Sequence, residues 1–310
     1  MPFVISCFAA QNPLQEGGGR KGLPRSFLNR FTKVFVEALS HDDLLYITSS
    51  MFPKLVEEEN QFVGGRGTIE KMIKFNTQIQ EDTMVAKKYG RQGAPWEFNL
   101  RDVFRWCELL TRRQCGHFDP SKGIDMIYLQ RFRCADDCKH VLTQFNHIFE
   151  SQVEIDYFPS YYLTPSSVQV GSSFLSRSPS ACQTHISYPR GLGRQLEHLM
   201  ACVEMSWPSL LVGPSGSGKT CAVRWLANIT GNSLREIVLN NSTDATELLG
   251  CYKQISKGRF EWVDGALVKA VEQGDWLLLD NVNFCNANVL DRLNSLFEPN
   301  GKLLINECGL

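Results

Sequence analysis

The chain has 310 residues, which is enough for one large domain or two modest ones with buried cores. Hydrophobic residues make up 43% and charged residues 21%, ordinary values for a soluble globular protein, and no apolar run approaches the ~20 residues that cross a bilayer. A net charge of −1 gives no general attraction to nucleic acid or to anionic membranes, so the composition offers no direct nucleic-acid or membrane signal.

The first elements in chain order are a mixture of strand and helix. Residues 3–10 are apolar and predict a buried strand, and no basic region precedes them as in a signal peptide. A loop rich in Gly and Pro follows, then a short helix at residues 25–31 and a short strand at residues 32–39. Because the first strand begins so abruptly, we expect the chain to start inside a domain.

From Ser40 onward the apolar residues recur at helical spacing. Ser40 is a helix-capping residue, two aspartates suit the first turn, and Pro53 limits the helix near its end. Three further helices are predicted, the second of them beginning at Asn99. Residues 40–150 therefore predict a small helical bundle. Its apolar positions are Leu44, Thr48, Met51, Phe52, Leu55, Ile69, Met72, Ile73, Ile79, Leu100, Val103, Phe104, Cys107 and Leu110.

The eleven cysteines are odd in number and include no CxxC pair, which indicates reduced thiols in an intracellular protein. Cys134, Cys138 and His140 are the nearest approach to a metal-binding cluster. A second ligand pair is missing downstream, so we do not expect a zinc site.

Residues 151–191 are rich in Ser, Pro and Tyr and lack helical periodicity, which favours a connector with one strand at Val168–Val170. From Leu192 helical and strand patterns alternate, as in a parallel α/β sheet. The sequence therefore predicts four parts, at residues 1–39, 40–150, 151–191 and 192–310.

The segment GPSGSGKT matches the phosphate-loop pattern G-x-x-x-x-G-K-[ST]. Its glycines let successive backbone N–H groups curl around a phosphate without side-chain clashes. Lys219 would reach the β- and γ-phosphates, the Thr220 hydroxyl would bind Mg²⁺, and the helix that follows directs its N-terminal dipole at the anion. A strand, SLLVG at residues 209–213, is predicted before the loop. The nucleotide-binding positions are Gly213, Pro214, Ser215, Gly216, Ser217, Gly218, Lys219 and Thr220.

A second motif supplies the metal-binding half of such a site. The apolar run at residues 276–279 predicts a strand buried on both faces, and it ends in Asp280, which together with Thr220 would hold Mg²⁺. The next residue is Asn281, at a position where a carboxylate would orient the attacking water and accept its proton. Since Asn cannot take up a proton at neutral pH, we predict good nucleotide binding and cleavage weakened by ~10²–10⁴-fold.

Residues 192–310 resemble the first part of an AAA+ ATPase core, and specifically a module of the midasin family. The resemblance is carried by GPSGSGKT, by LNNSTDATELLGCYK, and by the pattern W-x-D-G-x-L within FEWVDGALVKAVEQGDWLLLDNVN. It continues through ANVLDRLNSLFEPNGKLLINECG, which looks like a helix followed by a β-hairpin insert. The implied fold class is α/β, a partial P-loop AAA+ parallel sheet with an α-helical lid bundle from the preceding module.

Residues 1–150 are similar to the other end of such a module. FVISCFAAQNP resembles the sensor-1 strand, which would place Asn12 near the γ-phosphate. LPRSFLNRF resembles the arginine-finger segment, with Arg30 as the preferred finger and Arg25 as the alternative. NLRDVFRW resembles the sensor-2 helix and would make Arg101 its arginine.

The resemblance implies ATP and Mg²⁺ as cofactors, neighbouring AAA+ modules and the pre-60S ribosomal particle as partners, and the nucleus (nucleolus and nucleoplasm) as the location. Asn281 departs from the family pattern, because most modules of this kind carry Glu there, and no complete catalytic site can be assembled from one copy of the chain.

Two functions stay open at this point. One is a segment of an ATP-driven ring in assembly of the large ribosomal subunit, and the other is a nucleotide-binding module, or an inactive fragment, without turnover. A small P-loop kinase is disfavoured because no separate substrate lid follows the metal-binding strand. Half-sheets without partner strands also predict exposed edges and marginal stability.

Overall fold

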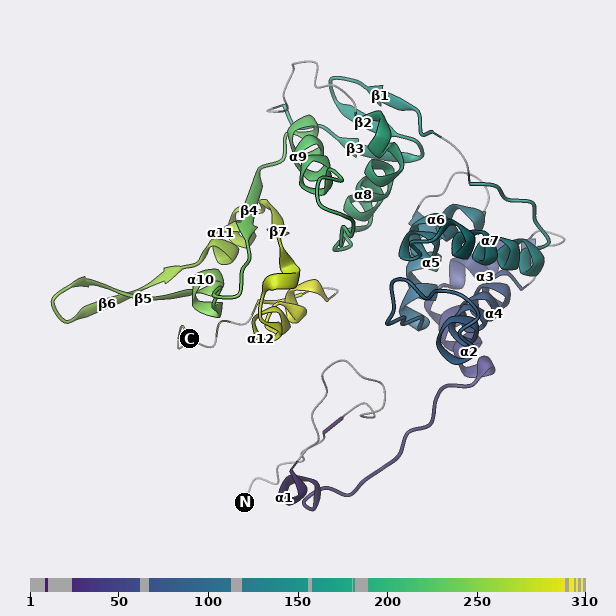
Figure 1. Cartoon of the computed structure of the whole chain (residues 1–310), viewed down its shortest axis with the longest axis horizontal. Helices are drawn as coiled ribbons and strands as arrows, with labels where there is room; N and C mark the ends of the chain where they lie inside the picture. The colour runs from purple at the N-terminus through teal and green to yellow at the C-terminus, as the bar shows by residue number, and fades with distance from the viewer. Residues whose placement is uncertain are drawn as a thin grey trace.

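The computed structural model describes residues 9–10, 24–61, 67–112, 119–155, 158–179, 181, 189–298, 301–303, 305 and 308. Figure 1 shows an extended N-terminal segment with one short helix, a helical bundle, and an α/β part from which a long hairpin projects. None of the helices in these ranges is both long and apolar enough to span a membrane.

The N-terminal segment contains the short helix that the sequence predicts, α1 (Arg25–Leu28). The predicted strand at residues 32–39 is wrong, since these residues form no helix or strand and Val34, Phe35 and Val36 are each more than 80% exposed. A strand requires a hydrogen-bonding neighbour, and no strand of the described ranges pairs with this segment. The predicted strand at residues 3–10 lies outside the described residues, except for two positions without regular structure.

The helical bundle is confirmed, and we call it the lid. Its entry helix is capped as predicted: the Ser40 hydroxyl accepts a hydrogen bond from the Asp43 N–H at 3.2 Å, and the Asp43 carboxylate accepts one from the Ser40 N–H at 3.0 Å. Pro53 begins a new helix at the position where its missing N–H costs nothing. The lid helices are α2 (His41–Met51), α3 (Pro53–Gln61), α4 (Thr68–Gln80), α5 (Leu100–Arg112), α6 (Ser121–Ile127) and α7 (Ala135–Phe149).

The lid core is built from aromatic rings. The Phe75 ring lies 5.1 Å from the Tyr128 ring and 5.7 Å from the rings of Trp106 and Phe145, and all four side chains are fully buried. The polar atoms of these rings are satisfied, because Trp106 Nε1 donates to a backbone carbonyl and the Tyr128 hydroxyl donates to Asn76. Most of the predicted core positions are buried, but Met51 is exposed.

The segment interpreted as a connector forms a small antiparallel sheet. Its strands are β1 (Tyr161–Leu163), β2 (Ser167–Val170) and β3 (Ser173–Ser176), paired in that order. The predicted strand at Val168–Val170 is confirmed, whereas the two strands on either side of it were missed. Val168 and Val170 are fully buried against two helices, α8 (Gly193–Met205) and α9 (Lys219–Thr230), so the sheet packs on the part of the chain that follows it.

The second core contains a parallel strand pair, β4 (Leu234–Val238) and β7 (Trp276–Asp280). The predicted strand at residues 209–213 is wrong, because no strand is assigned there and Leu210 and Val212 are 78% and 65% exposed. The prediction that β7 is buried on both faces is also wrong, since each of its residues is half-buried. In the described part of the chain β4 is its only strand neighbour, so one edge of β7 stays open. The helices beside this pair are α10 (Ala245–Leu249), α11 (Ala266–Gln273) and α12 (Ala287–Asp291).

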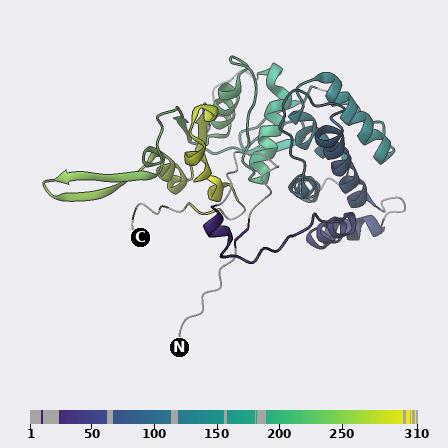
Figure 2. The same ribbon diagram turned by 60° about the horizontal axis from the view of Figure 1, so that its bottom comes forward.

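The projecting hairpin consists of β5 (Gly250–Ser256) and β6 (Arg259–Asp264), and Figures 1 and 2 both show it extending away from the helices. Its two-residue turn contains Gly258 at φ 82°, a left-handed conformation that glycine adopts readily. The hairpin predicted near the C-terminal end falls largely outside the described residues and stays a prediction, while the described residues after Asp280 form α12 and two short 3-10 helices.

The W-x-D-G-x-L pattern joins this hairpin to α11. Trp262 Nε1 donates to the Asp264 carboxylate at 2.8 Å, and the Gly265 N–H donates to the Leu249 carbonyl at 3.0 Å. A Cβ atom on Gly265 would lie 2.2 Å from the Leu248 carbonyl oxygen, so only glycine fits. Leu267 then enters the core at 0% exposure. The spacing of this pattern is therefore explained by folding, through Trp262, Asp264, Gly265 and Leu267.

Candidate functional site

The GPSGSGKT segment forms a tight loop that runs directly into α9. Gly216 and Gly218 have φ values of 78° and 85°, in the left-handed region where a side chain would be strained. Residues 213–217 are exposed to solvent, and α9 begins at Lys219, so the first N–H groups of the helix point at the loop. This backbone fits an anion such as a phosphate group.

Lys219 folds back over its own loop. Its Nζ atom donates to the Gly213 carbonyl at 3.0 Å and to the Pro214 carbonyl at 2.8 Å. A phosphate bound in the loop would offer a charged acceptor in place of these neutral carbonyls, and charge-assisted hydrogen bonds are the stronger kind. The lysine is therefore already placed at the loop where the anion would bind.

The metal-binding residues predicted from the sequence come together across the sheet. Thr220 at the start of α9 donates its hydroxyl to Asp280 Oδ2 at 3.3 Å, although the two residues are 60 positions apart. The other carboxylate oxygen of Asp280 accepts the Asn281 N–H at 2.9 Å, which fixes its orientation. A hydroxyl and a carboxylate side by side are hard oxygen ligands of the kind that Mg²⁺ accepts, directly or through water, so the donor set fits this ion.

Asn281 has a left-handed backbone, at φ 59° and ψ 38°, and an exposed side chain. Asn tolerates this conformation better than most residues. Its amide can orient a water by hydrogen bonding but cannot accept a proton at neutral pH. The position is therefore open to a bound nucleotide and lacks a general base.

Two ion pairs that sequence reasoning missed hold the site together. Arg224 of α9 donates to both carboxylate oxygens of Glu236 on β4, at 2.6 and 2.5 Å, and the hydrogen bond from Arg224 lowers the pKa of Glu236. Arg235 of β4 donates to Asp275, next to β7, at 2.8 Å. Opposite charges at helix and strand positions gave no signal of pairing, because such residues are solvated in most sequences.

The other predicted catalytic positions are not gathered at this loop. Arg25 and Arg30 lie in and just after α1, and Figure 1 shows that helix far from α9. Arg101 is exposed in the first turn of α5, and no hydrogen bond or ion pair among the described residues joins it to the phosphate loop. Asn12 lies outside the described residues. The roles of these four residues stay predictions.

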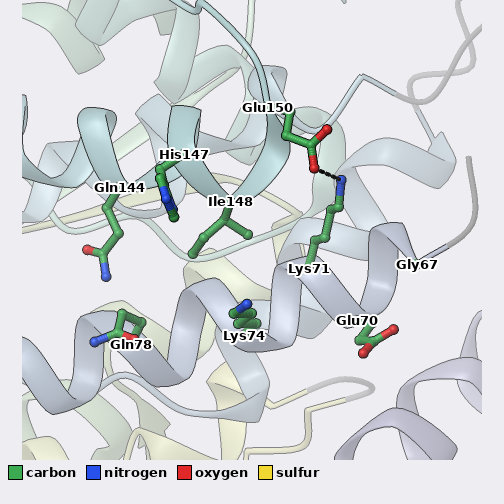
Figure 3. A pocket seen from close by; sticks show the side chains of 9 residues that line it. All are labelled: Gly67, Glu70, Lys71, Lys74, Gln78, Gln144, His147, Ile148 and Glu150. Carbon is green, nitrogen blue, oxygen red and sulfur yellow. Dashed lines mark ion pairs between the residues drawn. The ribbon is translucent and has the colours of Figure 1, made fainter. Parts of the chain in front are cut away.

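One pocket of the described structure, about 790 Å³ in volume, lies on the lid between α4 and α7 rather than at the phosphate loop. Figure 3 shows Lys71 paired with Glu150 at one end, with Lys74 on the α4 side of the groove and His147 on the α7 side. Charges of both signs line it, so it shows no clear preference for an anion or a cation. In the described ranges no group of three or more His, Cys, Asp or Glu side chains is placed to hold a metal ion.

A phosphate loop at the start of a helix, a strand ending in an aspartate beside it, and a separate helical lid define a P-loop ATPase of the AAA+ class. Comparison with family models agrees with this class. Residues 208–309 match the AAA domain of the dynein-related subfamily, and residues 43–152 match the Midasin AAA lid domain. The chain therefore belongs to the midasin family of AAA+ ATPases, with a lid followed by part of an AAA+ core.

Similar proteins support the same assignment. Midasin from Dictyostelium discoideum is 32% identical over 98% of this chain, in an alignment whose gaps extend it to 458 residues. Midasin from Giardia intestinalis is 29% identical over 82% of this chain. The chain spans 8% and 6% of these two relatives. An uncharacterized protein of Staphylococcus aureus (strain USA300) is 31% identical over 29% of the chain.

Proposed function

We propose that the chain binds Mg-ATP at the loop formed by residues 213–220. The observation that carries the proposal is the 3.3 Å hydrogen bond between Thr220 and Asp280, which brings the two metal-binding groups together beside the loop lysine. Lys219 and the first N–H groups of α9 would hold the phosphates, and Thr220 and Asp280 would hold the ion. When bound, Mg²⁺ neutralises phosphate charge.

We further propose that hydrolysis at this site is weak or absent. Asn281 cannot accept the proton of the attacking water, and a positioned base typically contributes ~10²–10⁴-fold to a rate. Among the described residues, no hydrogen bond or ion pair joins Arg30 or Arg101 to the phosphate loop, so neither of these two arginines is held there to stabilise the charge that develops during phosphoryl transfer.

For the longer protein we propose a ring of AAA+ modules that remodels pre-60S ribosomal particles in the nucleus during large-subunit assembly. The support is membership of the midasin family, which implies neighbouring AAA+ modules. Within such a ring this segment would supply a nucleotide-binding site. The second candidate is a spacer module whose bound ATP stiffens a contact between modules without turnover, and Asn281 is the observation that favours it.

Calorimetry with Mg-ATP, beside a phosphate-release assay, tests the proposal. We expect binding by the natural chain, about tenfold or greater loss of affinity in Lys219→Ala because a charged hydrogen-bonding group is removed, and no phosphate release above background. Lys257→Ala is the matched control, since this exposed lysine lies in the hairpin turn, away from the loop. Lys219-dependent turnover at ~1 s⁻¹ or faster, within the usual enzyme range, would contradict the absence of hydrolysis.

A further inference from the structure

Helix α8 lies between the lid and the phosphate-loop core, and its first turns are bonded to the lid. Asp125 of α6 accepts hydrogen bonds from Arg194 at 2.8 Å on both carboxylate oxygens. His198 Nε2 lies 3.2 Å from the same carboxylate, and Gln130 of the lid donates to it at 3.0 Å. Asp125 is buried, at 6% exposure, so its carboxylate is shielded from water.

The other end of α8 is attached to the lid as well. Met205, the last residue of the helix, is buried within the aromatic core of the lid. Two residues later, Trp207 Nε1 donates to Glu108 of α5 at 2.9 Å, and the Arg105 guanidinium lies 6.0 Å from the centre of the Trp207 ring. The lid thus holds both ends of a 13-residue helix that is about 20 Å long.

The opposite face of α8 enters the apolar cluster that also contains the phosphate-binding helix. Leu196 and Met200 are fully buried in one cluster with Ala222 and Leu226 of α9. Just before α8, Leu192 reaches the phosphate loop, since its Cδ1 atom lies 3.0 Å from where a Cβ of Gly218 would be. A displacement of α8 would therefore be felt at the residue immediately before Lys219.

We infer that α8 couples the lid to the phosphate loop, so that docking of Asp125 and Glu108 on its two ends holds α9 and the loop in their nucleotide-binding arrangement. A helix fixed at one point could still pivot, whereas attachment at both ends sets its position and its direction. Because packed cores transmit displacements instead of absorbing them, loosening either attachment loosens α9. The positioning residues are Asp125, Arg194, His198, Glu108 and Trp207. Only the test that measures affinity for Mg-ATP rests on the proposed function.

The first test is amide hydrogen exchange without nucleotide, read at α9, whose buried residues belong to a different apolar cluster from the lid core. We expect Asp125→Asn, which keeps the side-chain shape and removes the charge, to speed exchange in α9 by about fivefold or more, the lower limit of typical coupling. Asp136→Asn is the matched control, because this lid aspartate is exposed on α7 and its ion pair with Lys139 lies within that helix. Its α9 exchange should equal that of the natural chain.

The second test is the Kd for Mg-ATP in the same proteins. We expect Asp125→Asn and Trp207→Phe, which keeps an aromatic side chain and removes the N–H donor, each to weaken binding about fivefold or more. If Asp125→Asn does not fold, Trp207→Phe decides by both measurements. Unchanged α9 exchange in a folded variant overturns the coupling. Absence of Mg-ATP binding by the natural chain overturns the proposed function instead, and the exchange experiment still judges the coupling.

Discussion

The lid and the phosphate-loop core of this chain differ in how deeply their side chains are buried. The lid encloses a continuous aromatic cluster in which Phe75, Trp106, Tyr128 and Phe145 have at most 1% of their surface exposed. In the core, every residue of β7 is half-buried, and the chain leading into the phosphate loop is mostly exposed. The lid can therefore supply much of the folding free energy, while the core keeps a loop open for a ligand.

The contrast also explains why α8 matters to both regions. An open sheet edge and an exposed loop do little to fix the position of α9. The features that do fix it are the Arg224–Glu236 pair and the apolar cluster that α9 shares with α8 and β2. A thinly packed site thus gains order from a well-packed neighbour.

The largest expected effect separates the two regions by stability. Trp106→Ala removes a fully buried ring from the lid and should cost about 3–5 kcal/mol in the free energy of unfolding. Leu210→Ala, at an exposed position before the phosphate loop, should change it by no more than about 0.5 kcal/mol. Urea titrations followed by far-ultraviolet circular dichroism measure both. Equal losses from the two substitutions would show that the difference in burial does not govern stability.

A smaller effect is expected at the contact between the regions and depends on pH. Burial by itself would raise the pKa of Asp125, but the hydrogen bond and charge of His198 and the hydrogen bonds of Arg194 and Gln130 lower it to about 2 from 3.8. Because the folded-state pKa is the lower one, Asp125 stabilises the fold fully above about pH 4. This contribution, about 2 kcal/mol, is lost as the pH falls toward 2.

The difference between the natural chain and Asp125→Asn isolates this contribution from the titration of other carboxylates. Unfolding free energies measured from pH 5 to pH 2 should fall more steeply for the natural chain, with the two curves converging at the acid end. Parallel curves would mean that the buried carboxylate is not held in its charged form by the lid–α8 contact.

The smallest expected effect lies in the core alone. Asn281→Glu places a residue with little tolerance for a left-handed backbone at φ 59° and should cost about 1 kcal/mol. Asn281→Gly is the control, because glycine adopts this conformation freely. Exchange of the β7 amides reports the local stability of both variants. If the two variants are equally stable, the left-handed conformation at this position is not retained in solution.

Much of the lid could be predicted because the residues that start, stop and bury a helix lie close together in the sequence. Ser40 caps its helix and Pro53 begins the next, as their residue types require. The short helix α6 was missed because its Gly123 argues against a helix. That glycine is needed by the tertiary fold, since a Cβ there would lie 2.2 Å from the Trp106 ring.

The strands were predicted less well, because a strand forms only with a neighbour. Two apolar runs, residues 32–39 and 209–213, have the composition of strands but no pairing partner in the described structure. The hairpin at residues 250–264 was overlooked although Lys257 and Gly258 form a two-residue turn between alternating runs. Gly258 in this turn was the sequence signal that could have revealed the hairpin.

The sequence by itself determined the phosphate loop, because glycine spacing and one lysine specify a local backbone shape that needs few distant contacts. It also indicated that Asp280 and Thr220 would meet, through the order of the two motifs. Only the tertiary structure decided that Asp125 binds Arg194, 69 positions away, and that α8 lies between the lid and the phosphate loop. Charged pairs so far apart in sequence have no periodicity to reveal them, since their partners are chosen by packing.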